Sequence, residues 1–275
     1  MAFSFTKMHC NGNDYIVLET FTQEIYDLFT LSLILTDRRC GIGADAMIEV
    51  SPCEDADAEI RIYAPDGTQT DVAGCAVRCA VKLLYEQQIS DKEVYRLKTA
   101  YGIVEAEPVS VRRRTVSAVC QRIPLAVDAK TEALTVEAGD RQYRIYPVDH
   151  HGRHCVFLLN ENFAAEGDIE QVNLAAVASA INRLADYKQA AIEILDFSAQ
   201  GDSKMRMWIP GQGEARANAN GAAACVKALC ASGAELPLQD VRLAVRGGEM
   251  VYHIADGVLY LTGKVQAVYD GVSQL

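Results

Sequence analysis

The chain contains two copies of one order of elements, and this internal repeat limits the folds available to it more than any other feature. A strand, a small-residue helix and a pair of strands around a glycine turn occur in each half of the 275 residues. A shift of 145 residues, from Val81-Lys82 to Val226-Lys227, superposes the two helices. It also nearly superposes the hairpins at Tyr101-Gly102 and Gly247-Gly248. A repeat of whole supersecondary units predicts two similar lobes, joined near residues 115–125.

The spacing of apolar residues predicts which elements make up each lobe. Residues 76–88 and 220–233 have the helical spacing, and residues 15–19 and 46–50 are typical of strands. Both helices are rich in alanine, and small side chains let strands approach a helix closely. We therefore expect an α+β fold with a buried central helix in each lobe, although ordinary packing would also account for the composition.

Composition excludes several classes of protein. A formal charge of -11 does not fit a surface that neutralises nucleic-acid phosphates. No apolar run reaches the roughly 20 residues that a membrane helix needs, and no apolar leader follows Met1. The nine cysteines form no CxxC pair, so we expect reduced thiols in the cytoplasm. The cluster at 150–155 has no second half with metal-ligand spacing, so no metal site is expected.

Both predicted helices begin with a run of small residues, with Gly and Ala in both and Asn in the second. The first turn of a helix presents unpaired N–H groups and a partial positive charge, which together can bind an anion. Two such helix starts could hold the carboxylate of an amino acid. Simple helix capping is the alternative explanation.

Six stretches resemble a known family, in order and over nearly the whole chain. They are FTKMHCNGNDYIVLE, DRRCGIGAD, RIYAPDGTQTDVAGCAVRCAVKLLYE, HCVFLL, GQGEARANANGAAACVKA and LTGKVQAVYDG. Together they are similar to diaminopimelate epimerase, a cofactor-independent amino-acid epimerase of lysine biosynthesis. The resemblance implies two pseudo-symmetric lobes, each a curled, mainly antiparallel sheet around a central helix. The expected N-terminal lobe comprises residues 1–120 and 264–275, and the C-terminal lobe comprises 121–263.

The resemblance also implies a mechanism that this chain lacks the residues to perform. In the family, two cysteines on opposite faces of the α-carbon exchange its proton, and the helix starts bind the substrate carboxylate. Arg78-Cys79 fixes the register at the first helix, where the catalytic position is Ala73. Asn218 occupies the second catalytic position. A methyl group carries no proton, and a carboxamide does not titrate near neutral pH.

The family's substrate contacts are largely replaced as well. Asn13 is a matching polar contact, whereas Ala64, Ala191 and Ile209 stand where the family has polar or charged groups. The remaining expected ligand contacts are at the two helix starts. They are Gly74, Cys75, Ala219 and Asn220.

Other residues could replace the missing thiols. Cys75 lies two positions beyond Ala73, which is about 200° around a helix, so its side chain points away from the direction of the lost thiol. A structural role is therefore the simpler interpretation of Cys75. His154 can titrate near neutral pH. Cys10, expected in a loop, is a weaker candidate.

Three hypotheses follow for the function. The chain is a diverged isomerase that acts on an unknown small acid, a catalytically silent paralogue that binds a ligand or a partner, or a diaminopimelate epimerase in the full sense. Family members can dimerise, and Tyr269 matches a dimer-contact region, so a homodimer is expected.

Overall fold

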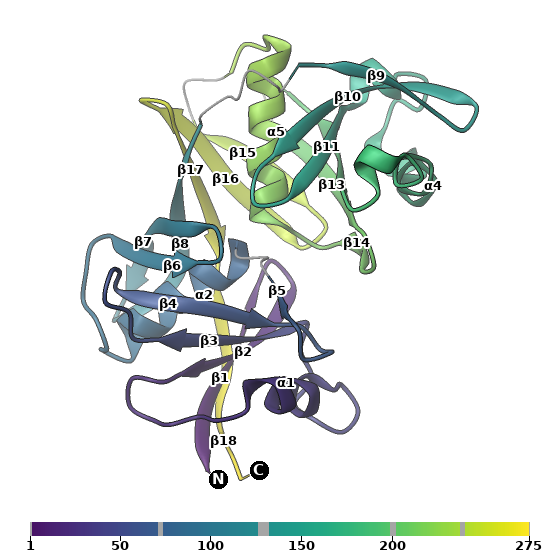
Figure 1. Ribbon diagram of the computed structural model, residues 1–275. Helices are drawn as coiled ribbons and strands as arrows, with labels where there is room; N and C mark the ends of the chain where they lie inside the picture. The colour runs from purple at the N-terminus through teal and green to yellow at the C-terminus, as the bar shows by residue number, and fades with distance from the viewer. Residues whose placement is uncertain (1, 71–73, 126–131, 199–201, 237–239, 275) are drawn as a thin grey trace. The chain divides into compact units, whose positions relative to one another are not determined.

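The computed structural model describes residues 2–70, 74–125, 132–198, 202–236 and 240–274. The chain divides into two compact units, which we call unit 1 (residues 1–123 and 262–275) and unit 2 (residues 124–261). Strands predominate and helices are few, so the expected α+β class is confirmed (Figure 1). None of the described helices is both long and apolar enough to span a membrane.

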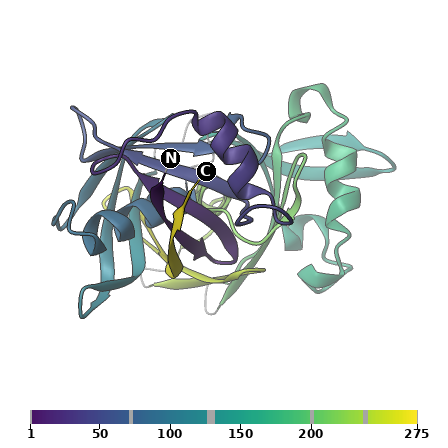
Figure 2. The same cartoon turned by 90° about the horizontal axis from the view of Figure 1, so that it is seen from below.

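Unit 1 is a sheet with two helices. Its elements in chain order are β1 (Phe3–Cys10), β2 (Asn13–Glu19), α1 (Leu28–Thr36), β3 (Ala46–Ser51), β4 (Ala58–Tyr63), β5 (Gln69–Thr70), α2 (Gly74–Glu86), β6 (Tyr95–Thr99), β7 (Gly102–Arg112), β8 (Thr115–Pro124) and β18 (Gln266–Ser273). The pairing of β1 with β18 places the two termini side by side (Figure 2).

Unit 2 repeats this plan with additional short helices. Its elements are β9 (Leu134–Ala138), β10 (Arg141–Asp149), β11 (Arg153–Leu158), α3 (Leu159–Asn162), η1 (Ile169–Gln171), α4 (Leu174–Ile181), η2 (Ala185–Tyr187), β12 (Ala191–Asp196), β13 (Ser203–Ile209), β14 (Gly213–Ala215), α5 (Ala219–Ser232), β15 (Val241–Val245), β16 (Gly248–Ala255) and β17 (Val258–Lys264). The last strand, β17, continues into unit 1.

The strand pairings reproduce the repeat seen in the sequence. In unit 1, β1 and β2 are antiparallel, β2 and β3 parallel, β3 and β4 antiparallel, β4 and β6 parallel, and β6 and β7 antiparallel. In unit 2, strands β10, β11, β12, β13, β15 and β16 follow the same order of directions. Antiparallel pairs predominate in both units, as expected.

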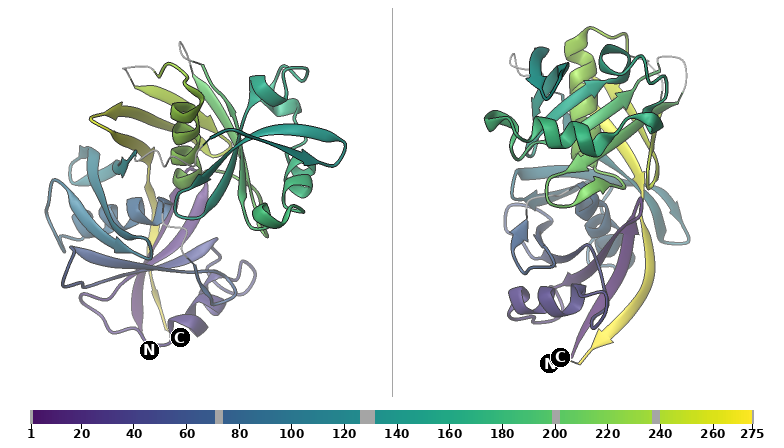
Figure 3. Two further views of the ribbon diagram at one scale, coloured as in Figure 1. Left: turned by 45° about the horizontal axis from the view of Figure 1, so that its top comes forward. Right: turned by 90° about the vertical axis from the view of Figure 1, so that its right-hand side faces the viewer.

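Each unit packs its sheet around one small-residue helix. Helix α2 contacts β1, β2, β4 and β7, and helix α5 contacts β10, β11 and β12 (Figure 3). Ala76 and Ala80 of α2, and Ala223 and Ala224 of α5, are fully buried. Because alanine projects only one methyl group, strands can approach these helices from several sides. The two central helices predicted from the sequence are therefore present.

Candidate functional site

A tight hairpin places polar side chains beside the start of α2. Asn11 and Gly12 connect β1 to β2, and both have positive φ, 49° and 84°. An Asn-Gly pair suits this type of two-residue turn, because asparagine and glycine tolerate the left-handed region. The turn therefore fixes the direction in which the chain presents Asn11 and Asn13.

Arg78 holds this hairpin against α2. Its guanidinium is fully buried, and Nη1 donates a hydrogen bond to Oδ1 of Asn11 at 3.3 Å. Gly263 in β17 makes room for it, because a Cβ at that position would overlap the guanidinium. The Arg78 that fixed the sequence register is thus a core residue of unit 1.

Cys75 lies where the hairpin meets the first turn of α2. Its Sγ accepts a hydrogen bond from Nδ2 of Asn13 at 3.9 Å, and the residue is 5% exposed. The hydrogen bond with Cys10 and burial both raise the pKa of the Cys75 thiol well above its usual value. Cys75 is therefore a protonated thiol at neutral pH and is poorly suited to serve as a base.

The other predicted contacts in unit 1 lie at separate points. Gly74 is the first residue of α2, while Ala64 lies in the turn after β4, where its N–H donates to the carbonyl of Thr68 at 2.8 Å. Ala73 lies outside the described residues. Cys10 is the buried last residue of β1, so its expected placement in a loop is wrong.

Asn218 is the N-cap of α5. Its Oδ1 accepts hydrogen bonds from the backbone N–H groups of Asn220 at 2.8 Å and Gly221 at 3.4 Å. These are first-turn groups of the kind that a bound anion would otherwise use. The Asn218 carboxamide, which the resemblance to the family would place at the second thiol position, therefore acts as a capping group for its own helix.

A pair of stacked histidines lies beside α5. The β10–β11 turn contains His150 and His151, whose rings stack with centroids 4.4 Å apart. Nζ of Lys227 donates to Nδ1 of His150 at 3.3 Å. Burial, followed by the charge of Lys227, lowers the pKa of His150 to about 3, so this imidazole is neutral. His151 forms a side-chain hydrogen bond with Asn220, although burial lowers its pKa overall.

His154 forms a buried ion pair with Glu193. Its Nδ1 lies 2.7 Å from Oε1 of Glu193, and its Nε2 lies 3.1 Å from the carbonyl oxygen of His150. Burial alone would lower the pKa of His154, but the charge and hydrogen bond of Glu193 outweigh it and raise the pKa. The carbonyl oxygen of His150 accepts from Nε2, and the raised pKa of His154 favours the form in which Nδ1 also donates, to Glu193.

The strand register explains why this pair forms. His154 of β11 lies opposite Ala191 of the parallel strand β12, and Glu193 is two residues further along the same face. Helix α5 closes over the pair at Gly221, where a Cβ would lie 2.8 Å from Oε1 of Glu193. Ala219 is the first residue of α5 and is buried, while Ile209 ends β13 opposite Gly213.

Sequence reasoning did not identify Glu193 or Lys227 as site residues. Only pairing of strands and helices brings them to the histidines, so spacing along the chain carries no signal for them. A signal did exist for Glu193, because a buried carboxylate in an otherwise apolar strand requires a partner. Across the described part of the chain, no group of three His, Cys, Asp or Glu side chains is arranged to hold a metal ion.

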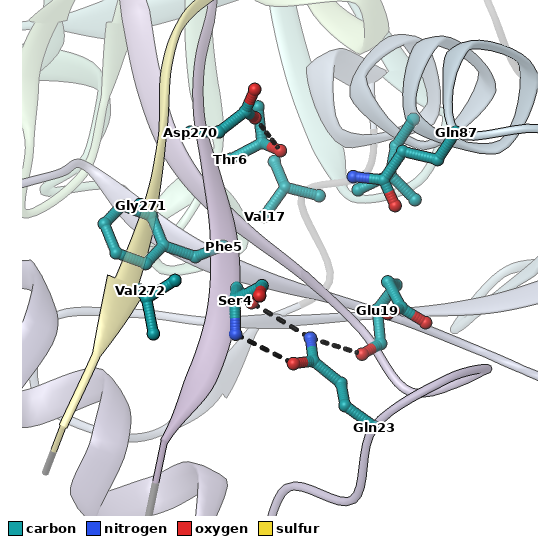
Figure 4. A pocket seen from close by; sticks show the side chains of 11 residues that line it. Ser4, Phe5, Thr6, Val17, Glu19, Gln23, Gln87, Asp270, Gly271 and Val272 are labelled. Carbon is teal, nitrogen blue, oxygen red and sulfur yellow. Dashed lines mark hydrogen bonds between the residues drawn. The ribbon is translucent and has the colours of Figure 1, made fainter.

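A cavity of about 250 Å³ lies elsewhere in unit 1, between β1, β18 and the end of α2 (Figure 4). Four of its polar residues bond in pairs. Gln23 bonds to both the N–H and the carbonyl of Ser4, and Thr6 donates to Asp270 at 2.7 Å. None of the predicted site residues that the structure describes lines this cavity.

Comparison with solved structures defines the class of fold. A hydroxyproline epimerase from Agrobacterium vitis superposes with a TM-score of 0.73 at 15% identity, covering 98% of this chain and 92% of that one. A protein of the phenazine biosynthesis PhzF family from Enterococcus faecalis also gives 0.73, at 13% identity with full coverage of both chains. The fold is therefore one shared with epimerases and PhzF-family proteins.

Sequence comparison narrows this class. The diaminopimelate epimerase family profile matches residues 5–119. Curated diaminopimelate epimerases are similar over the full length, at 26% identity for Brachyspira hyodysenteriae (all of both chains) and 28% for Geobacillus thermodenitrificans (98% of this chain, 96% of that one). The resemblance found in the sequence is confirmed: the chain is similar to diaminopimelate epimerases over its full length.

Proposed function

We propose that this protein is a catalytically silent relative of diaminopimelate epimerase that binds a small carboxylate ligand. The observation that carries the proposal is the hydrogen bonding of Asn218, whose side chain caps α5 at the position of the family's second thiol. A capping carboxamide neither removes nor returns a proton at neutral pH. The first thiol position is Ala73, which cannot do so either.

The thiols near the two helices do not compensate for this loss. Burial raises the pKa of the Cys10 and Cys225 thiols well above the usual value, and Cys75 is raised as well. A thiol base needs a depressed pKa and access to the ligand. These thiols therefore support packing roles and argue against thiol-based epimerisation.

Ligand binding is supported by what the chain retains. Asn13 is held at the start of α2 by the β1–β2 hairpin, as a matching polar contact of the family. The hydroxyproline epimerase of the same fold contains bound trans-4-hydroxy-L-proline, an amino-acid carboxylate. Because the first-turn amides of α5 are capped, we expect the ligand carboxylate to depend mainly on the start of α2. The nine free thiols fit a reducing, cytoplasmic location.

A diverged isomerase is the second candidate, and the His154–Glu193 pair favours it. A raised histidine pKa suits a general acid near neutral pH. Oε2 of Glu193 also has no hydrogen-bond partner among the described residues. Against this candidate, both nitrogens of His154 are already engaged, so it could donate a proton only after one of these hydrogen bonds breaks.

Proton exchange in D₂O separates these candidates. LL-diaminopimelate, L-proline and trans-4-hydroxy-L-proline are incubated with the wild type, and NMR follows the α-proton. We expect no enzyme-dependent deuterium incorporation, while thermal shift detects binding of at least one carboxylate. If the wild type exchanges the α-proton and His154→Gln does not, the diverged isomerase is established. If both the wild type and His154→Gln exchange it, both candidates are contradicted. No thermal shift with any carboxylate would contradict ligand binding.

A variant with both thiols restored tests the scaffold directly. Ala73→Cys combined with Asn218→Cys supplies a thiol at each catalytic position of the family. We expect α-proton exchange to appear with a carboxylate that the wild type binds, and to be absent from each single variant. The single variants are matched controls, because a two-base mechanism needs both thiols.

A further inference from the structure

Three cysteines converge in the core of unit 1. Sγ of Cys10 lies 3.6 Å from Sγ of Cys79 and donates to the carbonyl oxygen of Cys75 at 3.6 Å. Sγ of Cys75 in turn lies 4.0 Å from the carbonyl oxygen of Cys10. Cys10 is therefore the central member of this group, which we call the thiol cluster (Cys10, Cys75 and Cys79).

The fold fixes the thiol cluster from two elements. Cys75 and Cys79 are four residues apart in α2, so they lie on one face of the helix. Cys10 ends β1 directly before the rigid Asn-Gly turn. All three side chains are buried, and only Cys75 has measurable exposure. The arrangement is not suited to a metal, since no metal-holding group occurs among the described residues.

We propose that Cys10 and Cys79 form a redox-active pair that closes to a disulfide when the protein meets a peroxide. The two sulfurs need to approach from 3.6 Å to about 2 Å. The disulfide would link β1 covalently to α2. This proposal does not depend on whether the protein binds a carboxylate.

The chemistry balances with hydrogen peroxide as oxidant. The thiolate of one cysteine attacks peroxide, the O–O bond breaks, and the sulfur becomes a sulfenic acid while water leaves. The second thiol then attacks that sulfur, the S–S bond forms, and a second water leaves. Two thiols are oxidised and one peroxide is reduced to two waters.

The neighbours of the cluster affect the rate of this step. Burial raises the pKa of the Cys10 thiol, so oxidation is slow at neutral pH and accelerates as pH rises. The positive charge of Arg78 acts in the opposite direction on both Cys10 and Cys75. Cys75 retains its contact with Asn13 and stays reduced in the oxidised protein.

Peptide mapping can identify the partner of Cys10, because trypsin separates the three thiols. Cleavage after Lys7, Arg38, Arg61, Arg78 and Lys82 places Cys10 on peptide 8–38, Cys75 on 62–78 and Cys79 on 79–82. The folded full-length protein is treated with hydrogen peroxide, remaining thiols are alkylated, and the digest is analysed without reduction. We expect peptide 8–38 linked to 79–82, and release of the link by dithiothreitol.

Variants distinguish this pair from other products. Cys10→Ser and Cys79→Ala each remove the link, whereas Cys75→Ser retains it, and thermal unfolding shows which variants are folded. If Cys10→Ser does not fold, the loss of the link in Cys79→Ala alone tests the assignment. A link between 8–38 and 62–78 would overturn the assignment. Oxidation of the exposed Cys40 shows that the peroxide treatment has worked. If Cys10 and Cys79 of that sample are still fully alkylated after unfolding, the proposal is overturned.

Discussion

Oδ1 of Asn218 lies 2.8 Å from the backbone nitrogen of Asn220, close enough to occupy an amide at the start of α5. The Asn218 side chain is thereby part of the secondary structure of unit 2, as the N-cap of α5. A helix start that is capped from within has less capacity to bind an anion, because the same N–H groups serve both purposes.

The first prediction concerns this cap. Asn218→Ala removes the acceptor for Asn220 and Gly221 and should lower the free energy of unfolding by about 1 kcal/mol. Asn218→Asp keeps an acceptor and gains from the helix dipole, so it should be at least as stable as the wild type. Urea unfolding of the three proteins checks this. Equal stability of the alanine and aspartate variants would show that the cap contributes nothing.

Much of the fold could be predicted from the sequence, and particular residues show why. Val81-Lys82 and Val226-Lys227 lie in the same position of α2 and α5, because each helix occupies the same place in its unit. Local patterns of this kind depend on neighbours along the chain. The order of strands in the sheet depends on contacts between distant segments. Only the strand pairings show that unit 2 repeats the alternation of antiparallel and parallel pairs seen in unit 1.

The candidate site was less accessible to sequence reasoning. The resemblance identified Asn218 as a substituted position, but its role as a cap depends on the φ and ψ of the helix start. The partner of His154 depends on the register of β11 against β12. Likewise, Cys10 and Cys79 are far apart in sequence, and only the packing of β1 on α2 brings their sulfurs together. Contacts of this type carry no local signal.

A second prediction concerns the space around the buried Arg78. Gly263→Ala places a methyl group where the Arg78 guanidinium lies. Because Arg78 is fully buried, its guanidinium has no solvent to move into. We expect destabilisation of roughly 3 kcal/mol, measured by urea unfolding. The same change in an Arg78→Ala background should cost much less, since the overlapping group is gone. Equal costs in the two backgrounds would show that Arg78 is not the obstacle.

The third prediction is a pH dependence of stability that comes from His154. Its pKa is raised in the folded protein, so its stabilising contribution is fully present below the unfolded pKa of about 6.5 and is lost as pH rises through the folded value. Glu193→Gln removes the charge that raises the pKa and leaves burial, which lowers it. This variant should instead lose stability as pH falls below about 6.5.

NMR titration of the imidazole and urea midpoints between pH 5 and 9 check the third prediction. The His154 resonance should titrate above its usual range in the wild type and below it in Glu193→Gln. The exposed His253 is the matched control, and His253→Gln should leave the pH profile of the His154 resonance unchanged. Parallel stability profiles for wild type and Glu193→Gln would contradict a charged His154–Glu193 pair.

The last prediction is that the protein is a homodimer that associates through β18. This strand pairs with β1 along one side, and Val268, Tyr269 and Val272 are exposed on it. Tyr269 packs edge-on against Phe5, with ring centroids 6.1 Å apart. Aromatic residues of this kind often contribute most to an interface, so Tyr269→Asp should weaken dimerisation at least tenfold, by roughly 1.4 kcal/mol or more.

Light scattering after size exclusion measures the oligomeric state, with Tyr26→Asp as the matched control at an exposed tyrosine of the same unit. A monomeric wild type, or equal effects of the two variants, would rule out this interface.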